Sequence, residues 1–367
     1  MIKLLPDICK IQYGYAFDSA FFSNDEGVPL IRIRDVVRGY SETYTMENCG
    51  DEYIVQNGDI LIGMDGEFNI ARWNGGKAYL NQRVCRLIPS DAIDPLYLFY
   101  FMPKALKAIE DKTPFVTVKH LSAKELHKIE VPLPPMGEQI MIAQRLQLLD
   151  LLISFHKQQL AKLDELVKSR FIELFIGKGY PTKTVDEVSL GKGEYGAQSA
   201  SVEYDPTRPR YVRITDINDD GTLNDDVVAS INPADDEQYK LEYGDFMFAR
   251  MGATVGKTYA FVEGNQIFAG YLIRYRLNQT LINPRYLFWY TRLDEYWNWV
   301  KLNQSGAAQP GINAKKYGSL QIPLPPIEEQ NAFAAFVEQT DKSKLAIQES
   351  LAKMETLKNS LMQQYFG

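Results

Sequence analysis

VPLPPMGEQ (Val131–Gln139) returns 191 residues later as IPLPPIEEQ (Ile322–Gln330), and this duplicated segment decides how the rest of the chain is interpreted. In each copy the paired prolines hold the backbone extended and end the element that precedes them. Glu-Gln follows, and after it apolar residues recur at intervals of three and four. This spacing predicts a long helix beginning at each copy.

Three more segments recur in the same order. They are LIRIRDV (Leu30–Val36) and YVRITDI (Tyr211–Ile217), NGDILIGMDGE (Asn57–Glu67) and YGDFMFARMGA (Tyr243–Ala253), and IDPLYLFYFM (Ile93–Met102) and INPRYLFWYT (Ile282–Thr291). The offset between the copies grows only from 181 to 191 residues, as expected from small loop insertions. The chain therefore contains an internal repeat. We expect two similar halves related by a pseudo-two-fold axis.

Each half is expected to hold an α+β domain followed by a helical spacer. The domain alternates strand-like runs with Gly, Asn and Asp turns, then opens one helical segment at Asp94-Pro95 or Asn283-Pro284. The strand-like runs are Leu30–Ile33, Asp59–Ile62, Val84–Ile88, Tyr211–Ile214, Phe246–Ala249 and Ile273–Leu277. The predicted boundaries are residues 1–135 (head 1), 136–182 (central helical spacer), 183–325 (head 2) and 326–367 (C-terminal helical spacer).

The two spacers carry narrow apolar seams of the coiled-coil type. The expected interface residues are Leu146, Leu149, Leu160 and Leu163 in the first helix and Val337, Ile347, Leu351 and Met354 in the second. About 40 residues from Met136 make a rod of roughly 60 Å, which ends at the glycine-rich GKGYP (Gly177–Pro181). The order of domain, rod, domain and rod predicts antiparallel rods with the heads at opposite ends. The alternative is two surface helices that each pack on their own domain.

Two segments imitate nucleotide-binding motifs. GATVGKT (Gly252–Thr258) has three residues where a P-loop needs four, and the following YAFVEGNQIFAGYLIRYRL predicts a hairpin centred on Gly264-Asn265 rather than a helix. The first copy reads GEFNIAR (Gly66–Arg72) at this place and lacks the Lys-Thr. GKGEYG (Gly191–Gly196) fits a dinucleotide motif in its letters, but no amphipathic helix follows it. Phosphate chemistry is not expected.

Composition indicates a folded cytoplasmic protein. The chain has 367 residues, and its longest apolar runs, such as LQLLDLLISF, are too short to cross a membrane. Its three cysteines lack metal-ligand spacing and are expected to be free thiols. The net charge is −7, and each head holds 15 basic against 18 acidic residues. Bulk charge therefore does not attract nucleic acid, and any DNA affinity requires a locally basic face and partner subunits.

No catalytic residue and no metal ligand is expected. The sequence lacks the Asn-Pro-Pro-Tyr or Asp-Pro-Pro-Tyr tetrad of amino-methyltransferases, and its three histidines (His120, His127 and His156) are scattered. His156 falls on the helical seam, where a packed histidine is expected.

Several short segments of this sequence resemble segments of the specificity subunit of Type I restriction–modification systems. They include the two segments that carry LPP before the long helices. The others are YGYAF (Tyr13–Phe17), PLIRIRDV (Pro29–Val36), KSRFIELF (Lys168–Phe175), GEYGAQSA (Gly193–Ala200), RMGATVGK (Arg250–Lys257), GINAKK (Gly311–Lys316) and NSLMQQYF (Asn359–Phe366). The resemblance implies two target-recognition domains, each reading half of a bipartite site in double-stranded DNA, with the helices setting the gap.

The same resemblance implies that the chain catalyses nothing and binds no cofactor itself. Two methyltransferase subunits would bring S-adenosylmethionine, and restriction/translocase subunits would bring ATP. A nucleotide-binding enzyme and a coiled-coil scaffold without DNA are the alternatives.

Candidate DNA contacts are polar residues in glycine-rich loops, where the backbone can approach a ligand closely. Gln and Asn suit adenine edges, whereas Arg suits guanine or phosphate. The candidates are Arg72, Lys77, Thr117, Lys119 and His120 in head 1, and Arg250, Lys257, Gln304, Ser305, Gln309, Asn313 and Lys315 in head 2.

Overall fold

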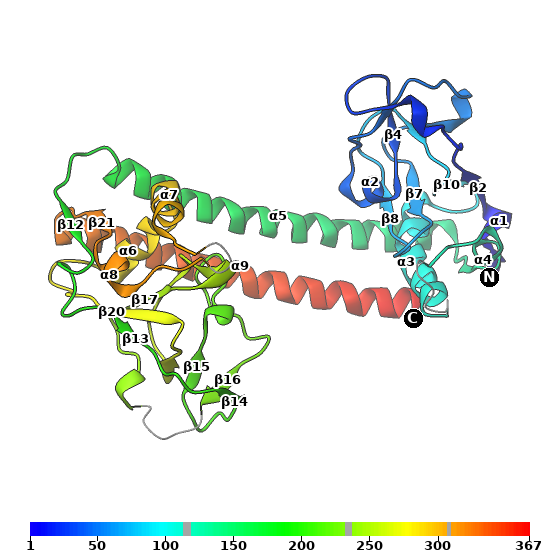
Figure 1. The fold of residues 1–367 in the computed structure, drawn as a ribbon. Coiled ribbons are helices and arrows are strands. Elements are labelled where there is room, and N and C mark those ends of the chain that lie inside the picture. The colour runs from blue at the N-terminus through cyan, green and yellow to red at the C-terminus, as the bar shows by residue number, and fades with distance from the viewer. Residues whose placement is uncertain (113–118, 232–236, 307–309) are drawn as a thin grey trace. The chain divides into compact units, whose positions relative to one another are not determined.

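The computed structural model describes residues 1–112, 119–231, 237–306 and 310–367 (Figure 1). The chain forms two compact units: unit 1 is Met1–Lys157 with Glu349–Gly367, and unit 2 is Gln158–Gln348. The two long helices, α5 (Met136–Phe175) and α9 (Ile327–Phe366), have 40 residues each. Each helix contributes one part to each unit. A unit therefore combines one head with the beginning of one long helix and the end of the other.

Each head is built on a four-stranded antiparallel sheet of the same topology. In head 1 the order is β2 (Cys9–Tyr13), β10 (Val84–Pro89), β7 (Ile60–Gly63), β8 (Ile70–Arg72). In head 2 it is β13 (Glu194–Tyr195), β20 (Leu272–Arg276), β17 (Asp245–Ala249), β18 (Thr258–Ala260). The mixed α/β domain predicted twice from the repeat is thus present twice.

Further strands complete the heads. Head 1 has the five-stranded order β3 (Phe22–Ser23), β5 (Tyr44–Thr45), β4 (Val28–Ile31), β9 (Ala78–Leu80), β6 (Ile54–Val55), with β4 and β9 parallel. Head 2 pairs β15 (Arg210–Val212) with β19 (Gln266–Phe268) in parallel, and β14 (Ser201–Glu203) with β16 (Ala229–Ile231). The strand before each long helix pairs with the first strand of its head, namely β11 (Glu130–Pro132) with β1 (Ile2–Leu4) and β21 (Gln321–Pro323) with β12 (Thr182–Thr184).

The remaining helices are short except for α3. In head 1 they are α1 (Leu5–Ile8), η1 (Ser19–Phe21), α2 (Ile33–Arg38), η2 (Asp51–Tyr53), α3 (Pro95–Lys112) and α4 (Ala123–Leu126). In head 2 they are η3 (Ile214–Asp216), η4 (Glu237–Tyr239), η5 (Gly252–Thr254), α6 (Pro284–Tyr290), α7 (Asp294–Asn303) and α8 (Ala314–Gly318).

The six predicted strand runs correspond to β4, β7, β10, β15, β17 and β20, but two of their ends were wrong. Ile33 and Ile214 begin the helices α2 and η3 instead of ending strands. The reason is local: the carboxylate of Asp35 accepts the N–H of Arg32, and that of Asp216 accepts the N–H of Arg213, both at 2.9 Å. Each buried aspartate caps a helix start.

Two further predictions for head 2 were wrong. The segment around Gly264-Asn265 is no hairpin, because β18 pairs with β17 while β19 leaves the sheet to pair in parallel with β15. The single helix expected from Pro284 is broken into α6 and α7. At the break the Thr291 hydroxyl donates to Phe288 O (2.8 Å), and the Arg292 guanidinium lies 3.7 Å from the centre of the Phe288 ring.

The repeated Glu-Gln places a buried glutamine that joins each long helix to its head. Gln139 accepts the N–H of Asp94 (2.9 Å) just before α3 and donates to Pro134 O (2.8 Å). Gln330 accepts the N–H of Asn283 (2.9 Å) before α6 and donates to the carbonyls of Pro325 (2.8 Å) and Leu281 (3.0 Å). The amides satisfy backbone groups that the prolines and the helix start leave without partners.

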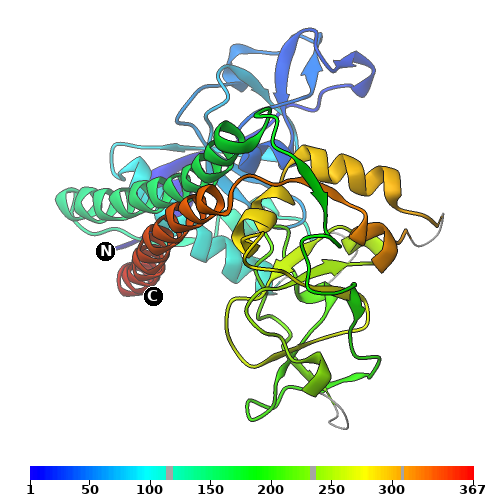
Figure 2. The same ribbon diagram turned by 90° about the vertical axis from the view of Figure 1, so that its left-hand side faces the viewer.

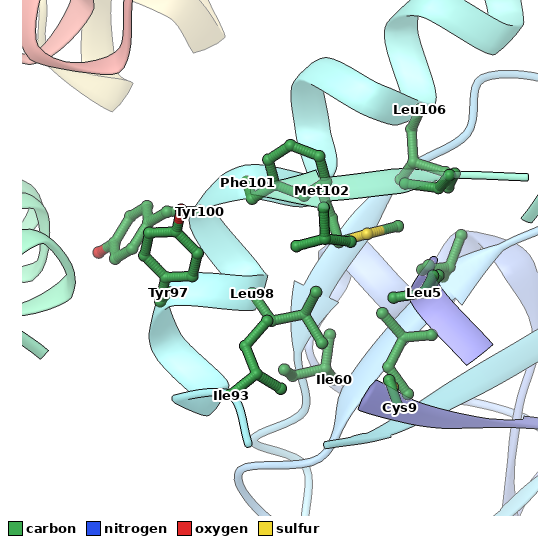
Figure 3. Packing of buried hydrophobic residues seen from close by; sticks show 14 of the residues in the cluster. Leu5, Cys9, Ile60, Ile93, Tyr97, Leu98, Tyr100, Phe101, Met102 and Leu106 are labelled. Atoms are coloured by element: carbon green, nitrogen blue, oxygen red, sulfur yellow. The ribbon is translucent and has the colours of Figure 1, made fainter. Parts of the chain in front are cut away.

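Buried apolar side chains fill the space between the sheet and α3 in head 1. Figure 3 shows part of this cluster, including Leu98 and Met102 of α3, Ile60 of β7, and Leu5 and Cys9. The corresponding cluster of head 2 contains Phe246 and Phe248 of β17 and Tyr286 of α6. Burial raises the pKa of the Cys9 thiol to about 12, so this cysteine is an inert packing residue.

The end of each long helix inserts an aromatic side chain into a core. Phe366 of α9 is 5% exposed and packs edge-on against Tyr97 (5.4 Å between ring centres) in unit 1. Phe175 of α5 is 2% exposed and packs edge-on against Tyr286 (5.0 Å) in unit 2. Figures 1 and 2 accordingly show both chain termini at unit 1. Gly177, which follows α5, has φ of 73°, as its predicted role in ending that helix requires.

Within each unit α5 and α9 are joined by ion pairs. In unit 1 Lys358 pairs with Asp150 (2.5 Å) and Glu355 with Lys157 (3.0 Å), whereas in unit 2 Lys344 pairs with Asp164. In unit 1, which has two such pairs, residue numbers fall along α9 as they rise along α5, so the paired segments there are antiparallel. The interface residues predicted from the seams are all buried or half-buried: Leu146, Leu149, Leu160, Leu163, Val337, Ile347, Leu351 and Met354. His156 is half-buried, and its ring bonds Leu152 O (2.9 Å).

Candidate nucleic-acid interface

In head 1 main-chain hydrogen bonds join a hairpin turn to a loop that lies more than 50 residues further along the chain. The turn joins β7 to β8, and the loop precedes α4. Gly66 N–H donates to Lys119 O (2.9 Å), and Leu121 N–H donates to Met64 O (2.7 Å). Ser122 then caps α4. We call residues 64–69 and 119–122 the turn–loop site of head 1.

Head 2 repeats this arrangement with the turn between β17 and β18 and the loop before α8. Gly252 N–H donates to Pro310 O (2.9 Å), and Ile312 N–H donates to Arg250 O (2.9 Å). Asn313 caps α8 through its side chain. Residues 250–257 and 310–313 are the turn–loop site of head 2. In head 2 both segments of the site hold predicted DNA-contact candidates, namely Arg250 and Lys257 in the turn and Asn313 in the loop. In head 1 only the loop holds candidates, Lys119 and His120.

Arg250 lies at the centre of the site in head 2. Its guanidinium carbon is 4.8 Å from the ring centre of Tyr195 and 5.9 Å from that of Tyr271. Both tyrosines are exposed, Tyr195 by 40% and Tyr271 by 56%. Cation–π contacts of this kind orient a guanidinium without neutralising it.

Lys257 ends the same turn but is already engaged. Its ammonium donates to Ile217 O (3.1 Å) and pairs with Asp219 (2.8 Å), and its side chain is 21% exposed. The hydrogen bond from Lys257 lowers the pKa of the Asp219 carboxyl. Contact between Lys257 and a phosphate would therefore require this pair to open. The turn itself connects two antiparallel strands, as predicted when GATVGKT was interpreted as a turn.

The other candidates of head 2 cluster around the loop of its site. Gln304, Ser305, Asn313 and Lys315 are exposed. Ser305 and Gly311, on either side of the segment 306–310, exchange main-chain hydrogen bonds (3.0 and 2.9 Å). Gln309 lies in that segment, outside the described residues.

In head 1 the site has a different charge arrangement. His120 Nδ1 is hydrogen-bonded to Asp65, and Arg83 lies 3.5 Å from the same carboxylate. Lys119 is turned away, because its ammonium donates to Glu110 O (2.9 Å). Thr117 lies outside the described residues.

Arg72 and Lys77 are separated from the turn–loop site. Arg72 pairs with Ile60, so it lies at the end of the β7–β8 hairpin opposite the turn. Lys77 follows Gly76, whose N–H is bonded to the side chain of Asn57 (2.7 Å). Both are exposed, but any ligand they share with His120 must extend along the hairpin.

Sequence reasoning missed Tyr195, Tyr271, Asp65 and Arg83. Main-chain bonds show that two of them are equivalent: Met64 N–H donates to Arg83 O, and Arg250 N–H donates to Tyr271 O, both at 3.0 Å. Extending the repeat alignment by one strand would have exposed the exchange of Arg83 for Tyr271. In head 1 the cation therefore lies immediately before β10, whereas in head 2 it lies immediately after β17.

Neither site shows the features of a metal centre. Across the described parts of the chain no group of three His, Cys, Asp or Glu residues is placed to hold a metal ion. Over the same residues, every helix is too short or too polar to span a lipid bilayer.

The comparisons with known proteins cover almost the whole chain and agree with one another. Residues 1–165 and 184–357 match the family model described as Type I restriction modification DNA specificity domain. The specificity subunit of the Type I restriction enzyme EcoBI from Escherichia coli is 29% identical over 402 residues, covering 99% of this chain and 84% of that protein. The MjaVIII specificity subunit of Methanocaldococcus jannaschii is 24% identical, covering 85% and 82%.

Solved structures agree at the level of the fold. The S subunit of a Type I restriction–modification system from M. genitalium has a TM-score of 0.65 at 13% identity, covering 100% of this chain and 96% of that one. A chain from a structure of Type I complex assembly and conformational transition has a TM-score of 0.59 at 16% identity, covering 100% and 97%.

Proposed function

Because this chain belongs to the family of Type I restriction–modification DNA specificity subunits, we propose that its two heads each read one half of a bipartite DNA target. As such a subunit it recognises DNA sequence and is itself non-catalytic. The observation that carries the proposal is the turn–loop site, which the fold builds twice from the same main-chain hydrogen bonds.

The two half-sites should differ in sequence. The backbone of the two sites is alike, but Met64 and Arg83 in head 1 stand where Arg250 and Tyr271 stand in head 2. Base sequence is read by side chains in the grooves, whereas backbone groups mainly position the duplex. Different side chains on one backbone frame therefore imply different bases.

We also propose that α5 and α9 form an antiparallel coiled coil that sets the gap between the half-sites. The ion pairs described above and the half-buried seams support this arrangement. The recognition domains would then be residues 1–135 and 183–325, with spacers at 136–182 and 326–367.

The helices would dock two methyltransferase subunits, which bring S-adenosylmethionine, and restriction/translocase subunits that bring ATP would join that complex in the cytoplasm. Co-expression followed by size-exclusion chromatography with light scattering tests the number of methyltransferase subunits. Two per chain is expected, and a stable one-to-one complex with full DNA affinity would contradict the two-fold arrangement.

Methylation mapping tests the function itself. A host that carries this gene and its methyltransferase partner should methylate a bipartite motif with a fixed gap, and deletion of this gene should remove that methylation while the partner is still expressed. Persistence of the motif without this chain would show that recognition lies elsewhere.

A further inference from the structure

We infer that Arg250, held between Tyr195 and Tyr271, reads a guanine in the half-site of head 2. The inference rests on the proposed function, since it names the base class recognised at one of the two turn–loop sites.

The first argument is the availability of the guanidinium. Described residues give Arg250 one polar side-chain contact, to the sulfur of Met251 (3.5 Å). By contrast, Arg213 is paired with Asp216 and Arg274 with Asp245. In the described chain no carboxylate pairs with Arg250, so its N–H donors can meet an external acceptor.

The second argument is orientation. The Tyr195 hydroxyl accepts the N–H of Ala314 (3.2 Å) at the start of α8, and this bond ties one ring of the pair to the loop of the site. Arg250 itself is tied at its backbone, where its carbonyl accepts the N–H of Ile312. An arginine that is held both at its backbone and at its guanidinium loses little conformational entropy when it donates two parallel hydrogen bonds. The base acceptors that match these two donors are O6 and N7 of guanine.

A phosphate would also accept from Arg250, and head 1 helps to separate the two ligands. If the site contacted only phosphate, a cation would be needed at the same place in both heads. Met64 stands at the position of Arg250 in head 1, and Arg83, the cation there, pairs with Asp65. A charge that changes place between the heads follows the pattern of base readout, because the backbone is the same at every target.

The test is Arg250→Lys in the complete methyltransferase complex. Lysine keeps the charge but loses the planar fork, so a guanine contact weakens while a phosphate contact survives. Methylation mapping should show one guanine of one half-site relaxed, with discrimination reduced about 5- to 150-fold at that position. The other half-site and the gap should be unchanged.

Three further variants keep the test informative. Tyr271→Ala removes one ring and should relax the same position, whereas Tyr271→Phe keeps the ring and should retain the motif. Arg208→Lys is the matched control, because the Arg208 guanidinium is already 3.4 Å from Asp205. Thermal melting of each complex checks folding.

Two outcomes for Arg250→Lys would overturn the inference. An unchanged motif with uniformly weaker DNA binding would assign Arg250 to a phosphate, and relaxed recognition in the other half-site would show that Arg250 does not read the half-site of head 2. Failure of the proposed function is distinguishable, because the wild-type complex would then produce no bipartite motif at all.

Discussion

Two polar side chains with little solvent exposure organise each head, and the repeat preserves both. The first is the glutamine of the Glu-Gln pair. The second is an arginine at the middle of the sheet. Arg86 donates to the carbonyls of Glu52 and Ile54 and pairs with Asp59, all within 2.9 Å. Arg274 binds the carbonyls of Gln238 (3.2 Å) and Lys240 (2.8 Å) and pairs with Asp245 (3.4 Å) in the same way. Both arginines tie a loop to the sheet.

Gln330→Ala should destabilise head 2 by about 2–4 kcal/mol, because it leaves one buried N–H and two carbonyls without partners. Urea unfolding of the complete chain measures the loss, and hydrogen exchange at the first turn of α6 locates it. Gln339→Ala on the exposed face of the same helix is the control and should be near neutral. Equal stability of the two variants would show that the amide is not needed to join helix and head.

Arg274→Met should cost about 3–5 kcal/mol, since it strands the buried Asp245 carboxylate. Burial already raises the pKa of Asp245, although Arg274 and Arg276 oppose the shift. The double variant Arg274→Met with Asp245→Leu should recover part of the loss, because both charges are then gone. If the double variant is less stable than the single one, the bonds from Arg274 to backbone carbonyls dominate instead of the ion pair.

The long helices contribute to the fold through their C-terminal ends as well as through their apolar seams. Phe366 lies one residue before the C-terminus, yet it packs between Tyr97 and Phe101 of α3 (5.4 and 5.9 Å between ring centres). Phe175 and Tyr286 repeat this contact in unit 2. The last turn of each helix is therefore part of a head core, which places the beginning of one long helix and the end of the other on each head.

Phe366→Ala should destabilise unit 1 by about 3–5 kcal/mol, the usual cost of a large cavity in a core. Hydrogen exchange should show faster exchange in α3 and in the last turns of α9, with the core of unit 2 unchanged. Leu357→Ala, at a residue of α9 that is 49% exposed, is the matched control. Equal protection of α3 in both variants would mean that the helix end does not support head 1.

At the scale of the whole molecule, the proposed function requires the duplicated heads to meet two half-sites of one DNA target, and the long helices α5 and α9 contribute to both units. In unit 1 the residue numbers of the two α5–α9 ion pairs change in opposite directions, and in unit 2 the pair Lys344–Asp164 joins the same helices. We therefore expect helix length to control the gap in the DNA target, while the heads control the half-site sequences.

Four residues inserted after Lys162 and another four after Lys353, which are equivalent positions in the repeat, should lengthen each helix by about 6 Å and keep its seam nearly in phase. Duplex DNA rises about 3.4 Å per base pair, so the preferred gap should grow by roughly one or two base pairs. Methylation mapping should show both half-sites unchanged. A changed half-site with the original gap would place specificity in the helices.

The sequence by itself determined the features that depend on neighbouring residues. Periodicity and proline position predicted helices starting at Met136 and near Ile327, and the repeat predicted two similar mixed α/β heads. The turn between β17 and β18 was also predicted, because its glycines act locally.

Only the tertiary structure decided which distant segments meet. The parallel pairing of β19 with β15, the rings around Arg250 and the contact of Lys104 with Phe366, 262 residues away, leave no periodic signal along the chain. The free energy of such contacts comes from burying surfaces that become neighbours only after the chain has folded. For that reason the candidates chosen from the sequence lie in both segments of the turn–loop site of head 2 but only in the loop of head 1, whereas the side chains that surround them were found only in the folded molecule.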